Sequence, residues 1–411
     1  MLKDKKIVLG ITGGIAAYKS AELTREFIKK GAFVRVIMTK NAAEFITPLT
    51  LQTLSGHPVF TDMFAPLTGF DMAHISLAEY AEIIVIAPAT ANVIGKIASG
   101  LADDILTTTV MATKAPVLIC PAMNVNMYNN TIVKENISRL IARGHLFMVP
   151  GYGELACMAE GYGRLPEIPD IVEEIESILT HKDLKGEKIL VTAGPTREPF
   201  DPVRYITNYS SGKMGYALAI AAKRRGAHVT LISGPTALSM PRDVKFIPVA
   251  SAVDMRDAVM EHLDSATVVI KAAAVADYRP SLRSGSKMKK GGDGLDLQLV
   301  RNPDIILEVG RKKGNRILVG FAVETENLVE NARNKMKKKN MDIIVANDVT
   351  KEGAGFGYDT NIIKILSPEG GIENIPLMSK MEVADRILDR VKKIITSKQS
   401  APRRRPAFRD R

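Results

Sequence analysis

Short apolar runs separated by helical patterns organise the first half of the chain. The runs that predict buried strands lie at residues 6–11, 33–38, 83–87, 117–120 and 147–149. A helical pattern at residues 15–30 follows the first run, and another at residues 169–180 closes the series. This alternation predicts a parallel sheet that is covered by helices on both faces, with right-handed crossovers.

The same layout begins again after a polar segment, HKDLKGE at residues 181–187, which is a plausible linker. Six further strands are expected, at residues 189–192, 229–233, 244–248, 268–271, 317–323 and 343–347. A late hairpin (361–366 and 373–377) and an amphipathic helix (381–396) end the pattern. We therefore predict an α/β protein with two doubly wound, mostly parallel-sheet, Rossmann-like domains, at residues 1–181 and 182–398.

Composition adds expectations about partners and location. The net charge of +11 over 411 residues favours anionic ligands. Part of that charge lies in residues 399–411, which we expect to be a disordered basic tail that serves solubility rather than nucleic-acid or membrane contact.

No apolar run approaches about 20 residues and no signal peptide is evident, so we expect a cytoplasmic protein. Two cysteines, Cys120 and Cys157, cannot make a disulfide framework.

Unusual residues of the first half fall directly after the predicted strands. GITGGIAAYK follows the first strand, Thr39 the second, APATAN the third and PAMNVNMY the fourth. These strand ends share one edge of a parallel sheet, where ligands bind. The glycine-rich turn lacks the G-x-G-x-x-G pattern, and no acidic residue follows the second strand, which favours a mononucleotide over NAD. The alternative is that the glycines serve only a tight turn.

Three side chains of this half are candidates for chemistry. Asn124 follows a strand and a proline turn, where it can bind a carboxylate without adding charge, or instead cap a helix. His74, in DMAHIS, is as readily structural as catalytic. Cys157 lies in a glycine-rich segment, GYGELACMAEGYGR, that we expect to be a lid. A thiol there could donate a proton in a site closed to water.

The second half opens with KILVTAGPTREPFDPVRYITNYSSGKMG, residues 188–215. A strand, a glycine-bearing turn and a helix start direct backbone N–H groups and the helix dipole at one point, which favours anion binding. Asp277, in KAAAVADYRP, could bind a ribose or help to hold a metal, or could cap a turn or helix.

Cationic and aromatic residues follow this stretch. Lysines on the Ser-, Gly- and Lys-rich loop at residues 281–294, and the run KMKKK at 335–339, could bind phosphates or form a solvated surface. We expect the loop to be mobile. Phe321, at a strand end, could stack on a base or belong to the core.

Several motifs together resemble the phosphopantothenoylcysteine decarboxylase family. They are GGIAAYK, the histidine of MAHISLA, PATANVIGK, PAMN followed by MY, and the ACMAEGYGR lid. These proteins are flavoproteins of the homo-oligomeric flavin-containing cysteine decarboxylase fold, which is flavodoxin-like. The second half resembles phosphopantothenate–cysteine ligase. Apart from its tail, the chain is therefore similar to the bifunctional enzymes of coenzyme A biosynthesis.

The resemblance of the first half implies FMN-dependent decarboxylation of phosphopantothenoylcysteine to 4′-phosphopantetheine. FMN would take a hydride from the cysteine thiol, creating an electron sink β to the carboxylate, and later return it. By analogy, His74 assists the oxidative decarboxylation, Asn124 holds the carboxylate and Cys157 protonates the enethiolate. The positions that match flavin-binding residues are Gly14, Ile15, Thr39, Ala89, Thr90 and Asn92.

The resemblance of the second half implies that CTP activates 4′-phosphopantothenate as an acyl-cytidylate and that the amine of cysteine then displaces CMP. Mg²⁺ and lysines would neutralise the carboxylate and triphosphate, with Asp277 as the metal candidate. Asn208 matches the residue that contacts the acyl group, and Arg204, Gly212 and Lys213 are candidate substrate contacts. The nucleotide positions are Ala272, Ala273, Asp277, Lys287, Pro303, Asp304, Ile305, Phe321, Lys335 and Lys339.

Two other functions stay open on the sequence alone: a flavoprotein of the same fold with another substrate, and a regulatory flavoprotein that binds a phosphatase. The ligase-like half and Cys157 both disfavour them. The resemblance also implies trimeric flavin domains and dimeric ligase domains, which close by symmetry as a dodecamer. We expect small molecules and further copies of the chain as partners.

Overall fold

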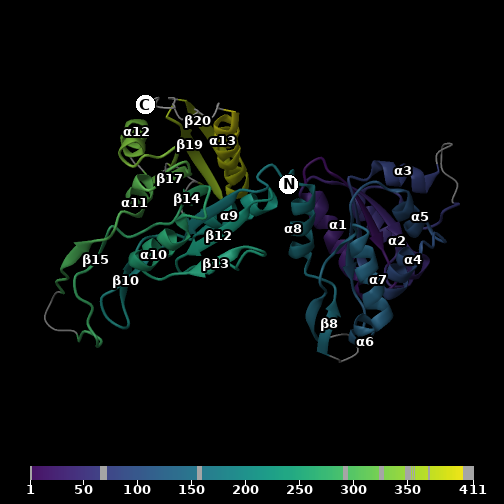
Figure 1. The fold of residues 1–411 in the computed structure, drawn as a ribbon. Helices are drawn as coiled ribbons and strands as arrows, with labels where there is room; N and C mark the ends of the chain where they lie inside the picture. Colours follow the sequence, from purple (N-terminus) through teal and green to yellow (C-terminus); the bar gives the residue numbers. More distant parts are fainter. Residues whose placement is uncertain are drawn as a thin grey trace, which may run out of the picture. The chain divides into compact units, whose positions relative to one another are not determined.

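The computed structural model describes residues 2–64, 72–154, 160–289, 295–323, 328–347, 353, 355, 357–368 and 371–400. Cys157 and the chain beyond residue 400 therefore lie outside the described residues. The chain divides into two compact units, Met1–Thr180 and His181–Arg411, and each is taken by itself (Figure 1). No helix of the described residues is long and apolar enough to cross a bilayer.

The first unit is built on a six-stranded parallel sheet in the order β3-β2-β1-β4-β5-β6. Its strands are β1 (Lys6–Ile11), β2 (Phe33–Met38), β3 (Val59–Phe60), β4 (Ile83–Ala89), β5 (Val117–Pro121) and β6 (Leu146–Phe147). The predicted parallel sheet is confirmed, although β3 was not foreseen, and β6 begins one residue earlier and ends two residues earlier than expected. The order reverses between β1 and β4, which places a ligand crevice at their carboxyl ends.

Helices cover both faces of this sheet and form a separate apolar core on each. They are η1 (Ile15–Tyr18), α1 (Lys19–Lys29), η2 (Lys40–Glu44), α2 (Pro48–Ser55), α3 (Ala73–Tyr80), α4 (Ala91–Ser99), α5 (Ile105–Ala112), α6 (Val125–Asn129), α7 (Thr131–Ala142) and α8 (Ile168–Leu179). Helix α8 shows why such segments pack: Ile168, Ile171, Val172 and Ile175 recur at helical spacing, and all four are buried.

The glycine-rich segment that we expected to be a lid is a β-hairpin. Strands β7 (Gly151–Glu154) and β8 (Glu160–Arg164) pair antiparallel, and the residues between them, which include Cys157, lie outside the described residues. Tyr152 and Tyr162 meet edge to face across the hairpin, with ring centroids 5.3 Å apart. The Met123 N–H donates to the carbonyl of Gly163 over 2.9 Å, so the hairpin is fixed beside the PAMNVNMY segment.

The second unit repeats the layout with eight strands in the order β13-β12-β9-β14-β17-β18-β19-β20. They are β9 (Lys188–Ala193), β12 (His228–Ser233), β13 (Lys245–Pro248), β14 (Val268–Lys271), β17 (Ile317–Val323), β18 (Ile343–Asn347), β19 (Thr360–Leu366) and β20 (Ile372–Ser379). The first six of these in order are parallel, while β19 and β20 form the expected antiparallel hairpin. The order reverses between β9 and β14, the second ligand crevice.

Helices again form two cores, with α9 and α13 on one face of the sheet and α10, α11 and α12 on the other (Figure 1). Their bounds are α9 (Lys213–Arg224), α10 (Ala252–Leu263), α11 (Ile305–Arg311), α12 (Leu328–Lys338) and α13 (Lys380–Ser400). Helix α13 ends at Ser400, so residues 399 and 400, which we assigned to the tail, are helical.

Two short hairpins that the sequence did not predict lie side by side in the second unit (Figure 1). One pairs β10 (Arg197–Pro199) with β11 (Tyr205–Thr207), and the other pairs β15 (Tyr278–Pro280) with β16 (Leu299–Arg301). We call these hairpins, with residues 281–289, the arm. The Ser284 N–H donates to the carbonyl of Phe200 over 2.9 Å. The described part of the loop expected to be mobile is therefore bonded to the neighbouring hairpin.

Candidate active sites

The larger of the two sites is a cavity of about 800 Å³ in the second unit, at the carboxyl ends of β14, β17 and β18. Twelve of the residues expected in the ligase site line it: Asn208, Gly212, Lys213, Ala272, Ala273, Asp277, Pro303, Asp304, Ile305, Phe321, Lys335 and Lys339. These residues come from segments far apart in the sequence. The crossovers of the sheet bring them together.

The start of α9 forms one wall, and its position depends on close backbone approach. Gly212 caps the helix with a left-handed φ of 77°. A Cβ on Gly212 would lie 2.7 Å from Cγ2 of Thr236, so there is also no room for a side chain. The first turn of α9 therefore reaches the end of β9, and Asn208–Lys213 face the cavity. A helix N-terminus in this position offers free N–H groups to an anion.

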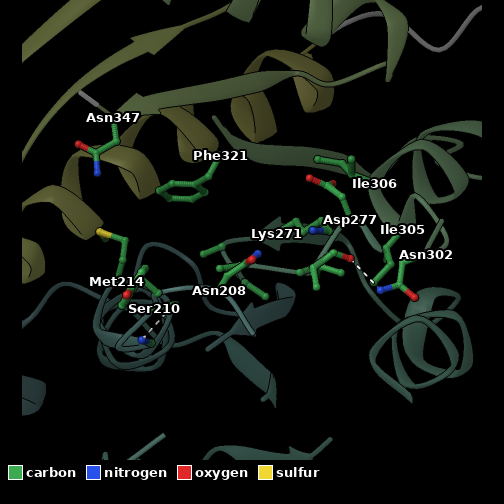
Figure 2. Close-up of a pocket in the computed structure, with 18 of the residues that line it drawn as sticks. Asn208, Ser210, Met214, Lys271, Asp277, Asn302, Ile305, Ile306, Phe321 and Asn347 are labelled. Carbon is green, nitrogen blue, oxygen red and sulfur yellow. Dashed lines mark hydrogen bonds between the residues drawn. The ribbon is translucent and has the colours of Figure 1, made fainter. Parts of the chain in front are cut away.

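The cavity has two chemically different ends (Figure 2). Phe321, Met214 and Asn347 lie at one end, where a ring and a thioether face an amide. Lys271, Asp277 and Asn302 lie at the other. Asn208 lies between the two groups in this view. The first end suits a flat heteroaromatic ring with a polar edge, and the second suits an anionic group with a cation.

Ion pairs set the electrostatics of the second end. Lys339 Nζ lies 2.7 Å from Oδ2 of Asp304. Burial alone would raise the pKa of the Asp304 carboxyl, but hydrogen bonds from Lys339 and from the Leu307 N–H outweigh it and lower that pKa. The pKa of the Lys271 ammonium is lowered to about 8, mainly by burial and also by the charge of Lys339, against the opposing effect of Asp304.

Cations also surround the start of α9. Lys213 Nζ donates to Oδ1 of Asp359 over 2.7 Å and to the carbonyl of Gly357 over 2.9 Å. The ammonium of Lys380, a buried residue at the start of α13, donates to the carbonyl of Tyr358 over 2.6 Å. Burial lowers the pKa of Lys380, and the charge of Lys213 lowers it further. These lysines give the cavity a positive wall.

Two expected site residues, Arg204 and Lys287, do not line this cavity. The guanidinium of Arg204 donates twice to Oδ2 of the buried Asp201, at 2.9 and 2.6 Å, and once to the carbonyl of Met288 at 2.9 Å. The Met288 N–H in turn donates to Asp201 over 3.3 Å. Arg204 therefore ties the arm together, and Lys287, beside Met288, is exposed on it.

The polar lining residues that sequence reasoning did not assign to the site include Lys271, Asn347, Asn361 and Lys380. Lys271 and Asn347 end the apolar strands β14 and β18, and Asn361 is the second residue of β19. A polar residue at the carboxyl end of a parallel strand is a usable signal, and it could have identified the first two. Lys380 carries no such signal, because it lies at a helix start.

The second site is a cavity of about 500 Å³ in the first unit. Gly14, Ile15, Thr90 and Asn124 line it, together with the β8 end of the lid hairpin. Thr39, Ala89, Asn92 and His74 are not part of this lining, and Cys157 is outside the described residues. Thr39 and Ala89 are buried at the ends of β2 and β4, while Asn92 is exposed on α4.

Hydrogen bonds between strand ends shape this site. The Thr12 hydroxyl donates to the carbonyl of Pro88 over 2.8 Å and accepts from the Thr90 N–H over 3.0 Å. A Cβ on Gly13 would lie 2.5 Å from Cβ of Asn41. Asn124 Oδ1 accepts from the Asn126 N–H over 2.8 Å, so Asn124 does cap α6, the alternative we considered, while it also lines the cavity.

The residues of this cavity fit a flavin. Ile15, Ala16, Met123 and Met127 form an apolar wall beside Gly14 and the Thr90 hydroxyl, which suits a flat ring that carries a phosphate chain.

Nδ1 of His74 is buried and has no hydrogen-bond partner among the described residues. The described residues contain no group of three or more His, Cys, Asp or Glu side chains that could hold a metal ion by themselves.

Two family models match the chain. The model described as Flavoprotein matches residues 1–180, and the model described as DNA/pantothenate metabolism flavoprotein C-terminal domain matches residues 184–395. Together these matches cover nearly all of the chain that the structure describes.

Full-length relatives are similar over the whole sequence. The coenzyme A biosynthesis bifunctional protein CoaBC of Bacillus subtilis is 50% identical over 407 residues, covering 98% of this chain and 100% of the relative. The CoaBC protein of Escherichia coli K12 is 45% identical over 395 residues, 95% of this chain and 97% of the relative. The solved C-terminal domain of a CoaBC protein is 43% identical and covers 53% of this chain and 99% of its own, with a TM-score of 0.46.

Proposed function

Because this chain belongs to the family of the bifunctional coenzyme A biosynthesis proteins CoaBC, we propose that its two units divide the family's two reactions. The chain is an enzyme with phosphopantothenate–cysteine ligase and phosphopantothenoylcysteine decarboxylase activities. We assign the ligase to the second unit and the decarboxylase to the first. The product of the ligase is then the substrate of the decarboxylase.

The main support for the ligase assignment is the single cavity lined by twelve expected site residues. Ligation by way of an acyl-nucleotide needs a carboxylate and a triphosphate to meet, although they repel each other. Three lysines of the lining, Lys213, Lys335 and Lys339, would offset this repulsion. Phe321 stacks on the cytosine of CTP, and the start of α9 at Gly212 and Lys213 binds phosphopantothenate. Asn208 then donates its amide N–H to the acyl oxygen between them.

We assign Mg²⁺ to the Asp277 end of the cavity. Mg²⁺ commonly takes only one or two protein carboxylates and fills its other positions with substrate phosphates and water, so a site without a carboxylate cluster fits it. The metal would neutralise charge on the phosphates. Asp277 would orient it toward the cavity centre, and the Lys339–Asp304 pair would hold the neighbouring wall.

For the decarboxylase we propose FMN as the flavin, held by Gly14, Ile15, Thr39, Ala89, Thr90 and Asn92. When bound, FMN supplies the oxidising equivalent that makes the substrate able to lose CO₂, and it returns the hydride afterwards. Asn124 binds the substrate carboxylate from the edge of the cavity, and His74 assists from α3. The lid hairpin excludes water, and Cys157, which lies between β7 and β8 in the sequence, donates the final proton.

Site residues outside their own unit's cavity are consistent with an oligomer. His74 and Asn92 of the first unit, and Arg204 and Lys287 of the second, do not line the cavity of their own unit. We propose that they act where copies of the chain meet, with the flavin units as trimers and the ligase units as dimers. Closed symmetry then gives a dodecamer.

The ligase assignment predicts a strict dependence on three substrates. Pyrophosphate release is expected only when CTP, 4′-phosphopantothenate and Mg²⁺ are all present, and CMP release should need cysteine as well. A coupled pyrophosphate assay, with each component omitted in turn, measures this. Equal release with no phosphopantothenate would contradict the proposal.

The Cys157→Ser variant is expected to decarboxylate its substrate once and then to stop at the unsaturated enethiol, because a serine hydroxyl is a far weaker proton donor. Mass spectrometry of the product measures this as a species two hydrogens lighter than 4′-phosphopantetheine. Cys120→Ala is the matched control, since Cys120 is fully buried in β5 and burial raises its thiol pKa far above the ordinary range. Saturated product at the native rate from Cys157→Ser would refute the role.

A further inference from the structure

Lys271 occupies a central and rigid position in the second unit. It ends β14, which pairs with β9 on one side and β17 on the other, and it stands opposite Thr192 and Gly320. The Ala272 N–H donates to the Thr192 carbonyl over 3.2 Å, and the Ala273 N–H to the Thr192 hydroxyl over 3.3 Å. The side chain therefore enters the cavity from a fixed backbone, at the crevice where the strand order reverses.

The ammonium of Lys271 has no hydrogen bond or ion pair within the described part of the chain, although the residue is half-buried. The charged groups that act on it are Lys335 of α12, Lys339 directly after α12, Asp304 at the start of α11, and Asp277 after β14. Asp304 is already paired with Lys339 at 2.7 Å. Because the Lys271 side chain lines the cavity and has no acceptor there, its three N–H donors are available to the oxygen atoms of a ligand.

The electrostatic state of the lysine agrees with this geometry. The Lys271 pKa is lowered to about 8, mainly by burial and also by the charges of Lys339 and Lys335. An anion beside the ammonium would reverse both effects, because it supplies hydrogen-bond acceptors and neutralises the neighbouring lysines. Binding of an anion would therefore stabilise the protonated form of Lys271.

We propose that Lys271 binds a phosphoryl group of a ligase substrate at the Asp277 end of the cavity. This inference rests on the proposed ligase function and adds to it a residue that the sequence motifs did not identify. In Figure 2, Lys271 lies between Asn208 and Asp277, and all three line the same cavity. A phosphoryl group that contacts Lys271 is therefore held between the residue assigned to the acyl group and the residue assigned to the metal.

Substitutions that keep or remove the charge test this directly. Titration calorimetry of the full-length protein would measure binding of MgCTP alone and of 4′-phosphopantothenate alone. Lys271→Met should weaken binding of one of them by about tenfold to a hundredfold, the range expected for a lost charge-assisted hydrogen bond. The ligand that weakens identifies the source of the phosphoryl group. Lys271→Arg should stay within about threefold of the native affinity, because it keeps the cation.

Lys338→Met is the matched control, because Lys338 is an exposed lysine of α12 outside the cavity lining. It should bind both ligands like the native chain. Native affinity for both ligands in Lys271→Met would overturn the proposal, and so would equal weakening by Met and Arg with unchanged thermal unfolding. Either result leaves the substrate dependence of pyrophosphate release intact, so it would not be confused with failure of the ligase assignment.

The pH dependence gives a second readout. The Lys271 pKa in the free protein is about 8, so the protonated form that binds an anion is lost as pH rises through that value. The ratio of native to Lys271→Arg affinity should therefore fall between about pH 7 and pH 9, since arginine stays charged. A ratio that is constant over this range would contradict the contact.

Discussion

The Asn208→Asp variant is expected to form the acyl-cytidylate and then to stall, with ligation slowed by about a thousandfold. Asn208 lies just after β11 and lines the cavity between its two ends (Figure 2). When the amine of cysteine attacks, negative charge develops on the acyl oxygen. An amide N–H stabilises this charge, whereas a carboxylate repels it. Formation of the acyl-cytidylate should be slowed less, because in that step the lysines and Mg²⁺ neutralise most of the charge on the carboxylate and triphosphate.

Chromatography of acid-quenched reactions would measure the stalled species. The variant should accumulate one acyl-cytidylate per active site with CTP and phosphopantothenate, and the addition of cysteine should not clear it. Asn374→Asp is the matched control, because it makes the same chemical change on exposed β20, outside the cavity lining. If Asn208→Asp turned over at the native rate, or if no intermediate formed, the role assigned to Asn208 would be wrong.

The Gly215→Ala variant is expected to destabilise the second unit by about 3 kcal/mol and to remove ligase activity. Gly215 lies in the first turn of α9, where a Cβ would sit 2.5 Å from Cβ of Ala193, 3.0 Å from its Cα and 3.1 Å from the carbonyl oxygen of Thr192. Backbone atoms of β9 cannot yield, so α9 must move away from the sheet. Helix propensity alone predicts that the variant is more stable, since alanine stabilises a helix by about 1 kcal/mol relative to glycine.

Calorimetric unfolding and separate assays would measure this effect. The first unit should keep its flavin absorbance and its decarboxylation of supplied phosphopantothenoylcysteine, because the two units have separate cores. Gly371→Ala serves as the control, since its Cβ would meet nothing closer than Ser367 Oγ at 3.7 Å. A Gly215→Ala protein that is as stable as the native chain and fully active would show that α9 need not approach β9 closely.

The periodic pattern predicted both sheets well, because buried parallel strands are continuous apolar runs that depend on local composition. Runs such as Phe33–Met38 and Ile343–Asn347 match the observed strands residue for residue. The hairpins β10–β11 and β15–β16 were missed, since each strand has only three residues and lacks the alternation that would mark it. Their pairing is set by contacts across the arm.

The residues of the candidate sites were likewise only partly predictable from the sequence. Glycines and asparagines after predicted strands could be identified from the sequence, because the carboxyl ends of parallel strands share one edge. The partners of Arg204 within the chain could not be predicted, since only the fold brings its guanidinium onto Asp201 and the Met288 carbonyl. The place of Lys380 beside Lys213 could not be predicted for the same reason, because the two residues are far apart in the sequence and only the fold brings them close.

By itself, the sequence determined the class of fold, the repeated strand–turn–helix opening and the family. These follow from local apolar periodicity and from contiguous motifs. Only the tertiary structure decided which side chains share a cavity, which cations are already paired and which is left for a ligand. Lys271 shows the difference: in sequence it ends an apolar run. In the fold it is a half-buried cation beside two other lysines, because three strands and two helices bring their ends together there.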